Sequence, residues 1–145
     1  MAGSVSPDEF CVQQANGTGT SFVAFLATSR ASALSLLNKE GPWKRADEVL
    51  IAMQASDFEN GLLIAPIDAT ADGKVYMNAA TKVWTGAKKP SEVGTAATTC
   101  SDWRGGGTSI GGFVGDNWTS AKLAWFYSGS IRCEEKDQHL LCIEP

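Results

Sequence analysis

The apolar positions of this chain fall mainly in short runs, with one clear helix signal near the beginning. Ser6 can cap a helix, Pro7 suits its first position, and Glu9, three residues after Ser6, completes a capping box. Asn16-Gly17 is typical of a helix end. We therefore expect a short helix that carries Cys11.

The other apolar runs predict strands more often than helices. Apolar residues on both faces of a short run are typical of a buried strand, whereas a spacing of three or four is typical of a helix. We expect a buried strand at 21–28, a helix at 29–38 that Gly41-Pro42 breaks, strands at 47–52, 82–86, 123–129 and 138–144, and two extended runs around a turn within 61–77. In the last strand Leu140 and Cys142 face one way and Leu141 and Ile143 the other, which predicts a central strand. The expected fold class is α+β.

The stretch from Thr85 to Gly115 has no such periodicity and is rich in Gly, Ser and Thr. A loop this long inside a compact domain usually has a function or is held by a cross-link. At 145 residues the chain can bury its own core, and neither a repeat nor a linker divides it. We expect one domain over 1–145, with residues 1–6 flexible or added.

Charge and hydropathy exclude two classes of partner. The net charge is −4 and the 12 basic residues are scattered, so we expect no nucleic-acid binding. A membrane span needs about 20 consecutive apolar residues, and the sequence contains no such run. The start, MAGSVSPDEF, lacks the pattern of a signal peptide. Its replacement of a removed signal segment is the favoured interpretation, and a cytosolic protein is the alternative.

The four cysteines indicate the compartment. Cys11, Cys100, Cys133 and Cys142 form no CxxC pair and no zinc-ligand spacing with histidine. Two disulfides and an oxidising environment are the favoured interpretation, and four buried free thiols are the alternative. Four cysteines can form two disulfides in three ways, and their number alone does not choose among them.

Catalytic chemistry finds little support in the residue pattern. His139 is the single histidine, and no nucleophile elbow accompanies it, so neither a Ser–His–Asp triad nor a catalytic zinc is expected. We expect no catalytic residue and no cofactor. The glycines of 104–115 fit neither phosphate-loop spacing.

One segment partly resembles a calcium loop. Asp68, Thr70, Asp72 and Gly73 occupy the first positions of an EF-hand loop, but Ala79 stands where the bidentate Glu is needed. A hairpin turn at Asp72-Gly73 is the favoured interpretation, and no metal is expected. Separately, the sequons at Asn16 and Asn117 matter only in a secretory-pathway eukaryote.

Several segments in order resemble a known family. CVQQANGTGTSFVAFLATSR (11–30), DGKVYM…KVWTG (72–86), CSDWR (100–104) and CIEP (142–145) are similar to landmarks of the endostatin domain of collagen. GPWKRADEVLIA (41–52) with GLLIAPI (61–67) is similar to bacterial endostatin-like surface proteins. The resemblance covers about residues 8–145.

The resemblance implies a variant of the C-type-lectin-like fold: short helices on a mixed, mainly antiparallel sheet with a long loop region. It also implies nested disulfides, Cys11–Cys142 and Cys100–Cys133. The chain lacks the N-terminal zinc histidines and the arginine-rich heparin surface of vertebrate endostatin. It has GDNW (115–118) but neither Glu-Pro-Asn nor Gln-Pro-Asp, so calcium-dependent sugar binding is not implied.

The function implied is that of a secreted or surface-displayed binding module. Its partner would be an extracellular-matrix, host or cell-surface protein, or a glycan. Alternatives are a structural or receptor-binding head of a larger assembly, or a small enzyme. The long loop region spans about Cys100 to Ile131, and the candidate ligand face is Arg104, Asp116, Asn117 and Trp118. Trp103 and Trp125 are expected in the core, and Trp118 exposed or half-exposed.

Overall fold

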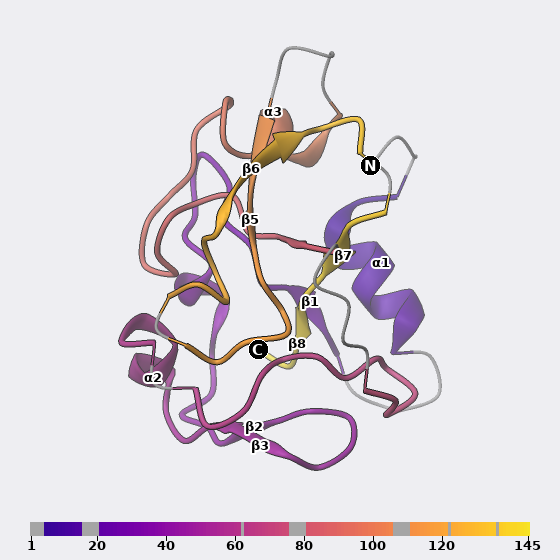
Figure 1. The fold of residues 1–145 in the computed structure, drawn as a ribbon, viewed down its shortest axis with the longest axis vertical. Coiled ribbons are helices and arrows are strands. Elements are labelled where there is room, and N and C mark those ends of the chain that lie inside the picture. Colours follow the sequence, from indigo (N-terminus) through magenta and orange to yellow (C-terminus); the bar gives the residue numbers. More distant parts are fainter. Residues whose placement is uncertain are drawn as a thin grey trace.

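Short helices and strands joined by long irregular segments make up the computed structural model (Figure 1), which describes residues 5–15, 21–61, 63–75, 81–105, 111–121, 123–135 and 137–145. In chain order the elements are α1 (Pro7–Gln14), β1 (Val23–Ala24), the 3-10 helix η1 (Leu34–Leu36), β2 (Trp43–Lys44), β3 (Leu50–Ala52), α2 (Ala55–Glu59), β4 (Val83–Trp84), α3 (Cys100–Trp103), β5 (Gly111–Gly115), β6 (Gly129–Arg132), β7 (His139–Leu140) and β8 (Cys142–Ile143). The α+β class is confirmed.

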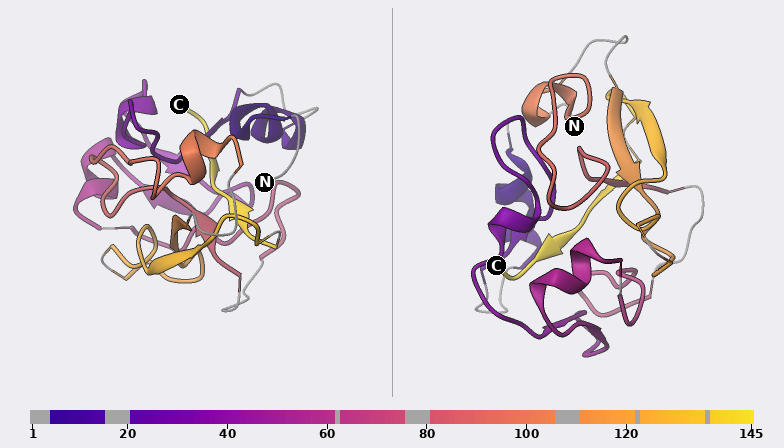
Figure 2. Two further views of the ribbon diagram at one scale, coloured as in Figure 1. Left: turned by 90° about the horizontal axis from the view of Figure 1, so that it is seen from above. Right: turned by 90° about the vertical axis from the view of Figure 1, so that its left-hand side faces the viewer.

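The described strands form three sheets. β1 pairs with β8, β2 pairs with β3, and four strands lie in the order β6-β5-β4-β7. The β4–β7 pair is parallel and the other pairs are antiparallel, as a mixed, mainly antiparallel sheet requires. Figure 2 shows β5 and β6 side by side along one flank, with α3 at one end of the molecule and the β2–β3 hairpin at the other.

Helix α1 forms where its capping signals predict it. The Glu9 amide donates to Ser6 Oγ at 3.2 Å, and the Ser6 amide donates to Glu9 Oε2 at 2.8 Å. Asp8 ties the helix to β1 by accepting a 2.9 Å hydrogen bond from the Ala24 amide. Ser6 therefore belongs to the folded domain, and Asn16-Gly17 lies outside the described residues.

Two apolar clusters make the core. The first contains Phe25, Trp43, Phe58, Trp125 and Phe126, whose ring centroids lie 5.2–6.2 Å apart in the recorded pairs. The second packs Trp84 against Trp103 at 5.8 Å, with Cys11, Cys100 and Cys133 around them. Trp103 and Trp125 are therefore core residues, as predicted.

Two disulfides fasten the fold. Cys11 joins Cys142 with a Cα–Cα distance of 5.4 Å, and Cys100 joins Cys133 at 5.6 Å. This is the nested pairing that the resemblance implies. The first bridge ties α1 to β8, so the beginning of the chain is held at its end.

Three expected elements are corrected. Of the helix expected at 29–38, only the 3-10 turn η1 forms. Residues 123–126 form a turn instead of a strand, and of the expected run 123–129 only Gly129 belongs to a strand, β6: the Phe126 and Tyr127 amides both donate to the Leu123 carbonyl, at 2.9 and 2.8 Å. The run 138–144 is divided between β7 and β8, each at the edge of a different sheet, so it is not one central strand.

Part of the expected loop at 85–115 is strand β5. A Cβ on Gly112 would lie 2.5 Å from Trp84 Cζ3 and 2.8 Å from Cys100 Sγ. A Cβ on Gly115 would lie 2.1 Å from the Trp125 carbonyl oxygen. Glycine is needed at both positions because aromatic core and disulfide pack directly against the strand backbone.

The turn α3 is left-handed. Cys100, Ser101, Asp102 and Trp103 have φ values of +50°, +57°, +55° and +62°. This conformation costs a non-glycine residue about 1–2 kcal/mol, and runs of such residues are rare. Tertiary contacts must therefore hold α3 in place.

Candidate functional site

The candidate site is built on the adjacent ends of β4 and β5. These strands are antiparallel with Val83 opposite Gly115, so Lys82, before β4, faces Asp116, after β5. The Lys82 ammonium donates to Asp116 Oδ1 in an ion pair that is half-buried. Ser128 Oγ donates to the same oxygen at 3.0 Å, and the Asp116 amide donates to the Ala124 carbonyl at 3.0 Å. Asp116 is thus fixed by contacts from three segments.

Asn117, the next residue, is buried, and no described residue makes a hydrogen bond with its Oδ1. Buried polar atoms normally have a partner, so this acceptor is an unusual feature of the site. The sequon at Asn117 is not accessible to a glycosylating enzyme on the folded domain, because the amide is buried.

Trp118 is the exposed aromatic residue of the site. Its side chain is 39% exposed, whereas Trp125 is 1% exposed. The expected difference between Trp118 and the core tryptophans is therefore confirmed. A ring with one face in water presents apolar surface that a ligand could cover.

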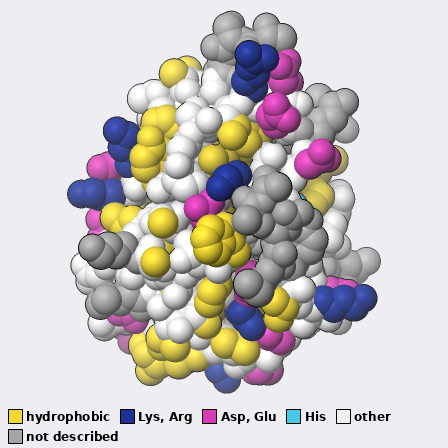
Figure 3. All heavy atoms as spheres, in the orientation of Figure 1, with side chains coloured by type: hydrophobic (Ala, Val, Ile, Leu, Met, Phe, Trp, Pro, Cys, Tyr) yellow, Lys and Arg dark blue, Asp and Glu magenta, His cyan; other side chains and the backbone are white. Residues whose placement is uncertain are grey.

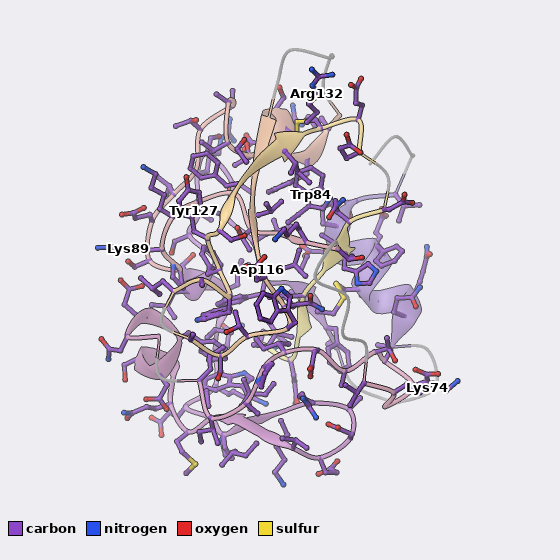
Figure 4. The ribbon with its side chains drawn as sticks, viewed as in Figure 1. Lys74, Trp84, Lys89, Asp116, Tyr127 and Arg132 are labelled. Atoms are coloured by element: carbon purple, nitrogen blue, oxygen red, sulfur yellow. A yellow bond between two sulfur atoms is a disulfide. The ribbon has the colours of Figure 1, made fainter. Side chains whose placement is uncertain are left out.

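The face formed by Lys82, Asp116, Trp118 and Ser128 is here called the Trp118 face. Figure 4 labels Asp116 near the centre of the view. In the same orientation, Figure 3 shows basic, acidic and apolar side chains meeting in this central region. The face combines an ion pair with a partly exposed aromatic residue.

Arg104 does not join the Trp118 face. It follows α3, which lies against the beginning of β5: Thr99 bridges to Gly112, and Cys100 Sγ lies next to the same glycine. Asp116 follows the other end of β5, and four residues of strand span roughly 13 Å. The expected grouping of Arg104 with residues 116–118 is therefore incorrect; Figure 1 shows α3 at the top of the view, far along β5 from this end.

Two residues of the face were missed from sequence. Lys82 begins a predicted strand and Ser128 lies in a run that was assigned to a strand, so neither stood out as a site residue. Only the β4–β5 register and the turn at 123–126 bring them to Asp116. The Lys82–Asp116 pair could have been predicted only if residues 111–115 had been recognised as a strand next to β4.

The acidic residues of the calcium-like segment have other partners. Asp68 is buried in an ion pair with Arg45, which also donates from Nε to Asp47 Oδ1 at 2.9 Å and from Nη1 to the Pro66 carbonyl at 3.1 Å. The hydrogen bond from Arg45 holds the pKa of Asp47 below its usual value, and Asp47 raises that of Arg45. Asp68 is thus occupied by a guanidinium in the place where a cation would bind.

The predicted hairpin turn at Asp72-Gly73 is present. Ala69 bridges to Val75, the Thr70 amide donates to the Lys74 carbonyl at 2.8 Å, and Gly73 has a φ of +80°. Hydrogen bonding to Thr70 and to Lys74 lowers the pKa of Asp72. Within the described ranges, no three His, Cys, Asp or Glu side chains gather as a metal site.

His139 lies on β7, opposite Val83 of β4. Burial lowers the pKa of its imidazole below 6.5, so the ring is neutral at pH 7. None of the described helices is long and apolar enough to cross a membrane.

Comparison with known proteins adds no assignment. The chain matches no protein-family model, and a search of curated proteins finds no significant relative. The functional argument therefore depends on the residues and on the geometry given above.

Proposed function

We propose that this chain is a secreted or surface-displayed, non-catalytic binding module of the endostatin-like, C-type-lectin-like type. It recognises an extracellular protein or glycan through the Trp118 face, to which the long loop region contributes Asp116, Trp118 and Ser128. The observation that supports the proposal is that Trp118, which is 39% exposed, lies two residues after Asp116 of the half-buried Lys82–Asp116 ion pair.

The physical argument is preorganisation. Asp116 and Lys82 are fixed before a ligand arrives, so binding does not have to order these side chains. The aromatic ring supplies apolar area at a small cost in conformational entropy. A ligand that covers the ring and exchanges hydrogen bonds with Lys82 or Ser128 would be held by both kinds of contact.

The proposed location follows from the cross-links. Two disulfides in a domain of this size are typical of an oxidising compartment. Such a scaffold also holds binding loops rigidly, which suits recognition outside the cell.

The test is a glycan and matrix-protein array probed with the oxidised wild-type domain and with Trp118→Ala. Because Trp118 is partly exposed, the variant should fold with a melting temperature within a few degrees of wild type. We expect it to lose at least about tenfold in affinity for whatever the wild type binds, which corresponds to 1.4 kcal/mol.

The matched control is Ile64→Ala, which removes an exposed apolar side chain, 56% exposed, next to β3. It should bind as the wild type does. Equal binding by Trp118→Ala and the wild type would exclude the Trp118 face, and unfolding of Trp118→Ala would show that the ring is structural. No binding to any arrayed glycan or protein would count against the binding function itself.

A further inference from the structure

The left-handed turn α3 carries one cysteine of the second disulfide. All four of its residues have side chains, and all four have positive φ. Such residues prefer right-handed or extended conformations, so the isolated segment Cys100–Trp103 would leave this conformation. The native turn persists because its surroundings determine it.

Besides hydrogen bonds to the residues just before it, three contacts with distant segments hold the turn. At its beginning Cys100 is bonded to Cys133, and at its end the Trp103 indole donates to the Ala27 carbonyl at 2.8 Å. Between them, the Asp102 carboxylate accepts from the Ser29 amide at 2.7 Å and from Ser29 Oγ at 2.6 Å. The disulfide is the one covalent contact among these three.

The second disulfide lines a small pocket together with Trp84, Trp103 and Gly105, although both of its cysteines are buried. Cys133 lies between Arg132, which Figure 4 labels, and Glu134. Arg132 Nη1 is 3.7 Å from Glu134 Oε1, so charges of both signs flank Cys133. An approaching thiolate therefore meets no uniform negative field.

We infer that Cys100–Cys133 is a redox-sensitive clamp on α3. A dithiol reductant reduces this bridge before Cys11–Cys142, and the turn then leaves its left-handed conformation. The inference goes beyond binding at the Trp118 face and does not depend on it. The outer bridge starts from the right-handed helix α1, so its reduction releases no such conformation.

The chemistry balances as a thiol–disulfide exchange. A thiolate of the dithiol attacks one sulfur of the bridge, forming a mixed disulfide and breaking the Cys100–Cys133 bond. The second thiol of the reagent then attacks the mixed disulfide and releases the remaining cysteine. Two electrons pass from the dithiol to the protein, the reagent leaves as its own disulfide, and both cysteines end as thiols.

Solvent exposure alone predicts that Cys11–Cys142 is reduced before Cys100–Cys133. Cys100 and Cys133 are both buried, whereas Cys142 of the outer bridge is half-buried and only Cys11 is fully covered. A faster reduction of Cys100–Cys133 would therefore report the strain of α3 and not simple access.

The experiment follows both bridges during dithiothreitol treatment of the native protein by alkylation and peptide mapping. We expect Cys100 and Cys133 to be alkylated at least about tenfold faster than Cys11 and Cys142, because breaking their bond lets the strained backbone of α3 relax. Equal rates, or earlier alkylation of Cys11 and Cys142, would overturn the inference.

Two glycine variants test the cause. Ser101→Gly relieves positive φ, and no described hydrogen bond involves the Ser101 hydroxyl, so the rate advantage of the second bridge should fall severalfold. Ser56→Gly makes the same change at an exposed position in the right-handed helix α2 and should leave the advantage unchanged. An unchanged advantage in Ser101→Gly would show that α3 is not the source.

Hydrogen exchange then tests the conformational change. In the oxidised protein the Trp103 amide donates to the Thr99 carbonyl at 2.8 Å and the Ser101 amide to the Ala96 carbonyl at 3.0 Å. Selective reduction should speed exchange at both amides, while the Ala15 amide, which follows α1 and donates to the Cys11 carbonyl, stays protected. Unchanged protection at Ser101 and Trp103 after reduction would mean that the turn does not need the clamp.

Discussion

The indole of Trp103 donates a hydrogen bond of 2.8 Å to the carbonyl of Ala27, a residue 76 positions earlier in the chain. This contact joins the end of α3 to the buried segment that follows β1. Trp103 also packs edge-on against Trp84 in the cluster that contains the second disulfide. One side chain therefore links the loop region to the core.

Trp103→Phe tests that link. The substitution keeps an aromatic ring but removes the donor to Ala27, and a lost buried hydrogen bond costs about 1–3 kcal/mol. We expect the free energy of unfolding to fall by that amount in denaturant titrations. Trp118→Phe is the control and should change it little, since Trp118 is partly exposed; equal stability of Trp103→Phe and wild type would contradict the role given to the indole.

The outer disulfide should contribute strongly to stability. Cys11 and Cys142 are 131 residues apart, so their bond restricts nearly the whole unfolded chain. The double variant Cys11→Ala/Cys142→Ala should lose about 2–5 kcal/mol of unfolding free energy. Thermal melts of the two proteins under non-reducing conditions measure this, and coinciding melts would refute the prediction.

Arg45 should be essential to the segment around β2 and β3. Its guanidinium is buried and pairs with Asp47 and Asp68. Arg45→Met keeps much of the side-chain volume but leaves Asp68 without its partner, which should destabilise the fold by about 3–5 kcal/mol. Lys44→Met, which breaks an exposed pair with Glu48, should change the unfolding free energy by less than about 1 kcal/mol.

Metal ions should not stabilise the wild-type domain. Asp68 is already neutralised by Arg45, and Asp72 is bonded to Thr70 and Lys74. Melting curves with EDTA, calcium or zinc should therefore coincide. A rise of several degrees with either ion at sub-millimolar concentration would contradict this prediction, because a ligand of the native state raises stability by mass action.

Acid should weaken the contact between α3 and Ser29. The hydroxyl and backbone N–H of Ser29 lower the pKa of Asp102 below 3.8 in the folded state. The unfolded chain then takes up this proton first, so the contribution is complete above the unfolded pKa and is lost as pH falls through the folded pKa.

The measurement for this contact is unfolding of wild type and Asp102→Asn from pH 7 to pH 2.5. The stability difference should be largest at neutral pH and should shrink below about pH 4. Ser29→Ala should show the same narrowing, and the double variant should lose less than the sum of the two single changes. A difference independent of pH would mean that the Asp102 charge does not matter.

Local signals were sufficient where a structure depends on neighbours in sequence. The Ser6–Glu9 capping box specified the start of α1, and Asp72-Gly73 specified a tight turn. The apolar run around Val83 was correctly interpreted as a strand. The cysteine pairing came from the resemblance to a family, because the arithmetic of four cysteines could not choose among connectivities.

Long-range packing decided the rest. Residues 123–129 have the composition of a strand, yet Trp125 and Phe126 belong to a turn that places both side chains in the core. A short apolar run predicts burial but does not specify the backbone conformation. Gly112 could not be recognised as a strand residue, since its role is to admit Trp84 and Cys100 from elsewhere in the chain.

The candidate site divides in the same way. Asp116 and Trp118 lie two positions apart, so their proximity could be predicted, and the polar stretch around Trp118 indicated its exposure, whereas nothing local indicated that Asn117 is buried. The β4–β5 register places Lys82 beside Asp116. The length of β5 separates Arg104 from Asp116, because the two residues lie near opposite ends of that strand. The sequence by itself determined that Asp116 and Trp118 lie close together, whereas the tertiary structure decided that Lys82 and Ser128 meet Asp116, because strand pairing is set by contacts between distant residues that no local pattern encodes.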